Sequence, residues 1–154
     1  MIKMIAAMDE RRAIWKNWKI PWHIEEDLER FRQLITGQTI IMWRWTFESL
    51  KHYYPDVHWH PLASINIILS KTLEISWVEI YKTLEEIIKK YPDIIIIWWW
   101  KTYETFLPFA DELDLTKISR SYNWDSFFPK YEEIFKKDND VKRNNIVFER
   151  WIRK

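Results

Sequence analysis

The chain has 154 residues and a formal net charge of +1, so we expect one domain over residues 1–154 and no strongly basic surface for nucleic acid. It contains no cysteine, which excludes disulfides and thiolate metal sites and fits a reducing compartment. The N-terminal segment lacks the apolar core of a signal peptide, so we expect a cytoplasmic monomer that does not bind membranes.

The first half of the chain is predicted to alternate strands with helices. Residues 2–8 are apolar and short enough for a buried strand. Residues 25–35 repeat apolar side chains at helical spacing, and acidic residues in the first turn complement the helix dipole. Residues 38–43 and 66–70 predict two further strands, with a short helix from Thr46 after the first.

The second half continues this alternation and ends in strands. The predicted elements are a helix over 78–90, a strand buried on both faces over 94–97, a helix around 103–107, a strand over 112–118, and two long strands near 131–137 and 145–152. This order favours an α/β fold with a central, mostly parallel mixed sheet, flanking helices and an antiparallel C-terminal edge.

Glycine and tryptophan occur in unusual amounts. The chain has 1 glycine and 12 tryptophans, whereas an average usage of about 7% glycine gives roughly eleven. Three tryptophans follow the predicted strand in IIIIWWWKTYETF, residues 94–106. A strand-to-helix turn usually takes glycine, because its backbone often needs positive φ and close approach to a ligand. Tryptophan therefore stands where glycine is expected.

The segment AIWKNWKIPWHIEEDLERFRQLITGQTIIMWRWTFESL, residues 13–50, resembles dihydrofolate reductases once Trp15, Trp18 and Trp43 are replaced by glycine. The same replacement turns IIIIWWWKTYETFLP into the family's I-G-G-G-x-x-Y-x-x-F-L-P. It also turns YNWDSFFP, residues 122–129, into Y-x-G-D-x-x-F-P. These blocks occur in family order across nearly the whole chain.

The resemblance implies the three-layer fold of this family and an NADPH-dependent reductase that converts 7,8-dihydrofolate, a small-molecule substrate, to tetrahydrofolate in one-carbon metabolism. The alternative is a catalytically disabled protein or scaffold with the same fold. Two departures favour it: glycine positions carry tryptophan, and Ser64 stands where the family has an arginine for the folate carboxylate.

One hypothesis for the tryptophans is that UGA codons read as glycine in the living organism have been translated as tryptophan. It covers Trp15, Trp18, Trp43, Trp98, Trp99, Trp100 and Trp124, whereas Trp22 and Trp151 fit the family as they stand. The rival explanations are deliberate replacement and a naturally tryptophan-rich protein. The codons of the gene distinguish the recoding hypothesis from the two rival explanations, since recoding requires UGA at the seven positions and UGG at Trp22.

Asp27 is the main catalytic candidate. We expect it in the first helical turn beside an apolar pocket, where burial raises a carboxyl pKa and suits the group to donate or relay a proton. The alternative is an acid that only complements the helix dipole. The resemblance implies that Asp27 promotes protonation of the pterin ring and that Thr116 holds it by a hydrogen bond. The substrate contacts that it implies are Ile5, Ala6, Leu28, Phe31, Leu50, Ile97 and Arg32.

Residues 14–23 resemble the family's loop that closes over the nicotinamide and excludes water. Trp22 and Ile20 are the catalytic candidates in this loop, with Ile20 touching the ring, and Asp125 is expected to hold the closed loop. The alternative for Trp22 is a core side chain beside a proline turn.

Arg44 and Ser70 match the family's NADPH phosphate contacts, a task that suits guanidinium and hydroxyl donors. In isolation, an arginine such as Arg44 is more often only a solvated charge at a helix start. The turn over 97–100 is the expected phosphate cradle, where the family joins two glycines by a cis peptide. The implied cofactor contacts are Ala7, Ile14, Trp15, Trp18, Trp43, Arg44, Trp45, Thr46, Ser70, Lys71, Trp98, Trp99, Trp100, Lys101 and Tyr103.

No metal is expected. His52, His58 and His60 raise the alternative of a metal site, but the sequence places no acidic or cysteine ligands with them in a fixed element.

Overall fold

The computed structural model describes residues 1–15, 24–53, 63–74, 76, 78–97, 100–123 and 125–154. The strands are β1 (Ile2–Asp9), β2 (Ala13–Trp15), β3 (Thr39–Trp43), β4 (Ile65–Leu69), β5 (Glu79–Tyr81), β6 (Ile94–Ile97), β7 (Glu112–Ile118), β8 (Ser126–Phe127), β9 (Phe135–Arg143) and β10 (Ile146–Arg153). The helices are α1 (Glu25–Ile35), α2 (Arg44–Tyr53), α3 (Leu84–Lys90) and α4 (Trp100–Phe106), the last followed by a 3-10 turn over Leu107–Phe109. None of the described helices is long and apolar enough to span a membrane.

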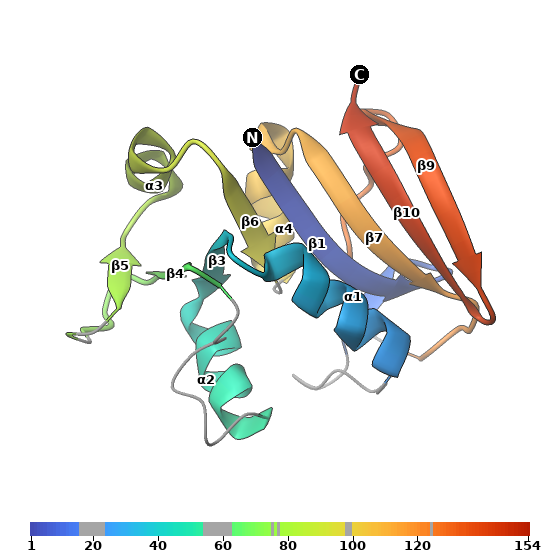
Figure 1. The fold of residues 1–154 in the computed structure, drawn as a ribbon, viewed down its shortest axis with the longest axis horizontal. Helices are drawn as coiled ribbons and strands as arrows, with labels where there is room; N and C mark the ends of the chain where they lie inside the picture. The colour runs from blue at the N-terminus through green and yellow to red at the C-terminus, as the bar shows by residue number, and fades with distance from the viewer. Residues whose placement is uncertain (16–23, 54–62, 75, 77, 98–99, 124) are drawn as a thin grey trace.

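Eight of the described strands form one mixed sheet in the order β5-β4-β3-β6-β1-β7-β10-β9 (Figure 1). The strands from β5 to β7 pair in parallel, and β10 pairs antiparallel with both β7 and β9. In Figure 1, α1 crosses the front of the sheet over β1 and α4 lies behind the sheet. The mostly parallel α/β sheet with an antiparallel C-terminal edge, predicted from the sequence, is confirmed.

The central strands bury both of their faces. In β6, Ile95 and Ile97 pack with Phe31 of α1, whereas Ile96 packs on the opposite side with Phe106 of α4. A strand that is covered on both faces has no solvent-facing positions to fill with polar residues. This explains why β6 is a run of isoleucines rather than an alternating pattern.

The predicted helix over residues 78–90 is wrong in its first half. Residues Glu79–Tyr81 form β5 at the edge of the sheet, where Ile80 pairs with Ile68 of β4. The helix α3 begins only after Thr83, whose hydroxyl accepts a hydrogen bond from the backbone N–H of Glu86. A threonine at this position is a helix N-cap. The helical spacing of apolar residues therefore continues on the N-terminal side of the residue where the helix begins.

The predicted strand over residues 131–137 is wrong at its start. The backbone N–H groups of Ile134 and Phe135 donate to the carbonyl of Tyr131 at 3.0 and 2.8 Å, which closes a turn. The strand β9 begins at Phe135 and continues to Arg143. Tyr131 is buried and packs edge-on against Trp151, with ring centroids 5.0 Å apart. The aromatic side chains buried in this turn give it the residue composition of a strand, which explains why its sequence predicted one.

Candidate active site

Asp27 lies in the first turn of α1, together with Glu25 and Glu26. The helix has Ile24 at its N-cap, which offers no side-chain hydrogen bond. The backbone N–H groups of Asp27 and Leu28 instead donate to the carbonyl of Ile24, each at 3.1 Å. Acidic side chains complement the positive end of the helix dipole, so this turn is favourable for a carboxylate even without a capping residue.

The surroundings of Asp27 act on its pKa in opposite directions. Burial raises the pKa because it disfavours the charged carboxylate, while a hydrogen bond to Thr116 and the positive charge of Arg30 act to lower it. Burial is the largest of these effects, and the pKa of Asp27 is raised above that of an ordinary aspartate. A carboxyl with a raised pKa retains its proton at higher pH, as a general acid requires.

Several predicted site residues line one small cavity beside Asp27. Its volume is ≈ 20 Å³, about the space of a single water molecule, so its walls enclose the carboxyl closely. The residues that line it are Ile5, Ala6, Ala7, Asp27, Leu28, Arg30, Phe31, Leu34, Asp114 and Thr116. The structure therefore brings the predicted acid, its predicted partner Thr116 and four of the predicted substrate contacts together.

The strand β7 supplies the polar wall of this cavity. Its leucines, Leu113 and Leu115, belong to the core on the far side of the sheet. The alternate residues Glu112, Asp114 and Thr116 are buried on the other face. The parallel register sets Thr116 beside Ala7 of β1, which explains how both line the space next to α1.

Ile97 and Arg32 differ in their relation to this cavity. Ile97 pairs with Ile5 in the sheet and is buried in the same apolar cluster as Phe31, so it lies next to the cavity. The Arg32 guanidinium lies against Glu25 and Glu29 at 3.2 and 3.5 Å on the exposed side of α1. Arg32 therefore does not line this cavity, and its predicted contact with the substrate stays a prediction.

A second polar group forms where β3 and β4 end. Arg44 begins α2, and its guanidinium contacts Glu48 at 2.9 Å and the Thr72 hydroxyl at 3.3 Å. Ser70 follows β4, and its hydroxyl oxygen accepts hydrogen bonds from the backbone N–H groups of Thr72 and Leu73. A hydroxyl that accepts in this way retains its own hydrogen for donation. Arg44 and Ser70 are thus linked through Thr72, and their contact with a cofactor stays a prediction.

An open groove extends from this turn along β5. Its volume is ≈ 770 Å³, and its lining includes Ser70, Lys71, Thr72, Ser76 and Lys82. Lysine ammonium groups and hydroxyls are the donors that a phosphate ester needs. The groove is large enough for part of a dinucleotide and carries the chemistry for its phosphate.

The remaining cofactor candidates are dispersed. Ile14 is buried in the main core, Trp43 is half-buried against that core, and Trp45 is exposed while Thr46 beside it is buried. Tyr103 is also in the core, where its hydroxyl donates to the carbonyl of Ile5 at 2.6 Å. Tyr103 therefore supports β1 from behind the cavity, and its hydroxyl is engaged with the backbone rather than directed at a ligand.

Other predictions fall on residues that the structure does not describe. Trp18, Ile20, Trp22, Trp98, Trp99 and Trp124 lie outside the described residues, as do His58, His60 and the side chains of Trp15, Leu50, His52, Trp100 and Lys101. The expected cis peptide of the phosphate cradle falls in the same part of the chain. Among the described residues, no group of three or more histidine or acidic side chains is arranged to hold a metal ion.

Sequence reasoning missed Asp9, which organises the backbone just before the predicted lid. Its buried carboxylate accepts from the N–H groups of Arg11 and Ala13, each at 2.8 Å, and from that of Tyr122 at 2.9 Å. It thereby ties the end of β1 to the segment after β7, and β2 pairs with β8 nearby. The signal available in the sequence was an aspartate directly after a buried strand.

Sequence reasoning also missed the pair formed by Arg30 and Asp114, whose side chains are 2.6 Å apart at Nη2 and Oδ1. The available signal was the spacing: Arg30 is one helical turn from Asp27, and Asp114 is two residues from Thr116 on the same strand.

The sequence matches the Dihydrofolate reductase family over residues 1–150. The chain belongs to the dihydrofolate reductase family. The dihydrofolate reductase of Haemophilus influenzae is 32% identical over 131 residues, covering 82% of this chain and 78% of that protein. The Bacillus subtilis enzyme of the same name is 31% identical over 136 residues, covering 86% and 78%.

A solved structure extends the similarity to three dimensions. Dihydrofolate reductase from Enterococcus faecalis, complexed with NADP(H) and RAB-propyl, has a TM-score of 0.82 and 25% sequence identity. The comparison covers 100% of this chain and 96% of that one. The whole chain therefore has the dihydrofolate reductase fold.

Proposed function

We propose that this protein reduces 7,8-dihydrofolate to tetrahydrofolate with NADPH. The observation that carries the proposal is Asp27, a half-buried acid bound to Thr116 in a cavity with both apolar and polar walls, with a pKa raised by burial. Family membership over residues 1–150 supports the same reaction. An acid in this setting favours a catalytic site over a scaffold that has only retained the fold.

The reaction adds a hydride and a proton across the C6–N5 double bond of the pterin. NADPH, when bound, supplies the hydride. The protein must promote delivery of the proton to N5. Two carboxyls line the described cavity, and we assign this role to Asp27, because Asp114 is paired with Arg30 at 2.6 Å. Thr116 holds the carboxyl, and the apolar walls of Ile5, Leu28 and Phe31 limit the access of water to it.

The cofactor would be held at the ends of β3 and β4. Arg44 and Thr72 offer hydrogen-bond donors at one turn, and Ser70 and Lys71 line the adjoining groove. These groups fit the phosphates of NADPH, which require cations and hydroxyl donors. The N-terminus of α2, which begins at Arg44, adds backbone N–H groups favourable to an anion.

The tryptophans at family glycine positions bear on cofactor affinity. Three indoles at Trp98, Trp99 and Trp100 stand where the family presents backbone N–H groups to the pyrophosphate. We expect the chain with tryptophan at these positions to bind NADPH weakly. Replacing all three by glycine should restore binding, because the backbone is then free to approach the phosphates.

The experiment compares two purified proteins, one with the residues as printed and one with glycine at Trp15, Trp18, Trp43, Trp98, Trp99, Trp100 and Trp124. NADPH binding is titrated by fluorescence, and dihydrofolate reduction is followed by the loss of NADPH absorbance. We expect activity in the glycine-bearing protein. A folded glycine-bearing protein that binds NADPH and leaves dihydrofolate unreduced would favour the scaffold alternative. Tight binding by the printed chain would refute the account of the tryptophans.

A further inference from the structure

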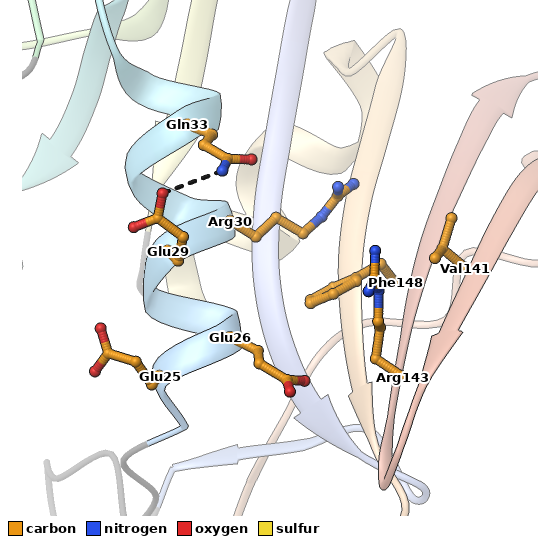
Figure 2. A pocket seen from close by; sticks show the side chains of 8 residues that line it. All are labelled: Glu25, Glu26, Glu29, Arg30, Gln33, Val141, Arg143 and Phe148. Carbon is orange, nitrogen blue, oxygen red and sulfur yellow. Dashed lines mark hydrogen bonds between the residues drawn. The ribbon is translucent and has the colours of Figure 1, made fainter.

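Arg30 lies between two spaces that α1 separates. It lines the small cavity beside Asp27, and it also lines a groove of ≈ 500 Å³ on the other side of the helix. Figure 2 shows its side chain extending from α1 across the strands toward Phe148 of β10, away from Glu25 and Glu29 on the other side of the helix. Its guanidinium carbon is 4.8 Å from the centre of the Phe148 ring.

The guanidinium is fixed by a buried partner. Its Nη2 atom is 2.6 Å from Oδ1 of Asp114, whose side chain is only 4% exposed. An ion pair at this distance with one buried partner keeps a single geometry better than a pair in solvent, where side-chain entropy competes. Asp114 therefore holds a positive charge one helical turn from Asp27.

Asp114 belongs to a network that continues away from the cavity. Lys3 of β1 contacts Asp114 at 3.1 Å and Glu112 at 2.6 Å, and Arg150 of β10 contacts Glu112 at 2.6 Å. The register explains this arrangement, because Lys3 pairs with Glu112, and Arg150 with Asp114, in neighbouring strands. Asp114 shares its one negative charge between Arg30 and Lys3, so the charge of Arg30 is only partly neutralised.

Building on the proposed function, we propose that Arg30, anchored by Asp114, is a positioning residue that sets the pH range over which Asp27 can supply its proton. The charged groups that face Asp27 from the described elements are Arg30 on its own helix and Asp114 on β7, with Lys3 of β1 behind them. Arg30 stabilises the carboxylate form of Asp27 and opposes the effect of burial. Without Arg30, Asp27 would remain protonated to a higher pH.

The two members of the pair should act in opposite directions. Arg30→Gln removes a positive charge and should shift the titration of Asp27 to higher pH. Asp114→Asn leaves the charge of Arg30 without its buried counter-ion and should shift that titration to lower pH. A pair that only stabilises the fold would not produce opposite shifts, since both substitutions would simply loosen the same contact.

Nuclear magnetic resonance of the ligand-free protein tests this directly. The side-chain carboxyl carbons of aspartate are labelled with carbon-13, and the Asp27 signal is assigned by its absence in Asp27→Asn. Arg143→Gln is the matched control, because it removes a guanidinium from the outer groove opposite Glu26 without a contact to Asp114. Arg30→Lys, which keeps the charge, should restore most of the original titration.

The pH dependence of reduction gives the second measurement. In Arg30→Gln, the upper limit of the pH–rate profile, the pH at which the rate has fallen to half its maximum, should move to higher pH by about one unit, since an opposite charge nearby lowers a carboxyl pKa by roughly 1–3 units. The Arg143→Gln profile should match that of the unsubstituted protein. Titrations of Asp27 that are the same in Arg30→Gln, Asp114→Asn and the control would overturn the inference.

The two proposals can fail separately. An Asp27 titration that shifts as expected in a protein unable to reduce dihydrofolate would refute the proposed function and support the electrostatic role of Arg30. An active protein whose pH–rate profile is unchanged by Arg30→Gln would support the proposed function and refute the role of Arg30. If Arg30→Gln does not fold, the Asp114→Asn and Arg30→Lys titrations still decide the matter.

Discussion

The substitution Asp27→Asn should lower activity and raise stability at the same time. Asparagine keeps the shape of the side chain and its hydrogen bonding to Thr116 but cannot supply a proton. A positioned general acid typically contributes ~10²–10⁴-fold to the rate, which corresponds to about 3–5 kcal/mol of transition-state free energy. The cavity of ≈ 20 Å³ leaves little room for water to replace the acid, so we expect the loss to lie within this range.

The gain in stability follows from the raised pKa of Asp27. Between the ordinary aspartate pKa of about 4 and the raised value in the folded state, the folded protein binds more protons than the unfolded chain. Stability therefore rises as the pH falls through this window, and at neutral pH the buried carboxylate destabilises the fold. Asparagine removes this cost, so the melting temperature of Asp27→Asn should exceed that of the unsubstituted protein at neutral pH. The difference should shrink in acid.

The assay pairs steady-state kinetics of a glycine-bearing protein with thermal unfolding at several pH values. Glu26→Gln is the control, because it removes a carboxylate from the same helical turn at an exposed position, where that carboxylate accepts a hydrogen bond from Asn144 at 3.4 Å. The control should leave kcat and NADPH affinity nearly unchanged. Near-normal turnover in Asp27→Asn would refute the assignment of the acid. A melting temperature that falls at neutral pH would refute the argument from burial.

Two further predictions concern stability. Tyr103→Phe removes the 2.6 Å hydrogen bond to the buried carbonyl of Ile5 and should lower the unfolding free energy by about 1–3 kcal/mol in urea titrations; an unchanged midpoint would contradict this role. Burial acts to raise the pKa values of Glu112 and Glu149, but hydrogen bonds to the carboxylates outweigh it and both pKa values are lowered. The donors are Lys3 and Arg150 for Glu112, and Lys137 and Trp151 for Glu149. Their stabilisation is therefore lost as the pH falls below the ordinary carboxyl range, and a Glu112→Gln, Glu149→Gln double variant should unfold with a weaker acid dependence; an equally steep dependence would contradict it.

Elements with a strong apolar period could be predicted from the sequence. The helix α1 has the predicted bounds, 25–35, since its apolar residues recur at helical spacing and acids mark its first turn. The strand β7 likewise has the predicted bounds. The errors arose where tertiary contacts decide the outcome. Ile80 and Tyr81 are compatible with a helix, and only the open edge of β4 makes them a strand.

The site could be predicted only in part, for a related reason. Asp27 and Thr116 follow from motifs in the chain, but the neighbours that adjust the acid come from the register of the sheet. Lys3 contacts both Glu112 and Asp114, and Arg150 contacts Glu112, because β1, β7 and β10 pair in one particular alignment. A shift of one residue would turn Asp114 to the opposite face. No local pattern contains that information.

The tryptophans separate the requirements of the fold from those of binding. Trp43 is half-buried and packs against the core, so the fold accommodates an indole there, and glycine would remove those contacts. Gly37, the one glycine present, has φ of 70° in the turn between α1 and β3, where a side chain would be strained. The printed sequence thus keeps glycine where this turn needs it and carries tryptophan where a ligand is expected. A third protein, with glycine at Trp98, Trp99 and Trp100 and tryptophan kept at Trp43, should therefore be compared with the protein that carries all seven glycines. Large-to-small changes in packed positions cost about 3–5 kcal/mol, and that loss could otherwise conceal a gain in NADPH affinity.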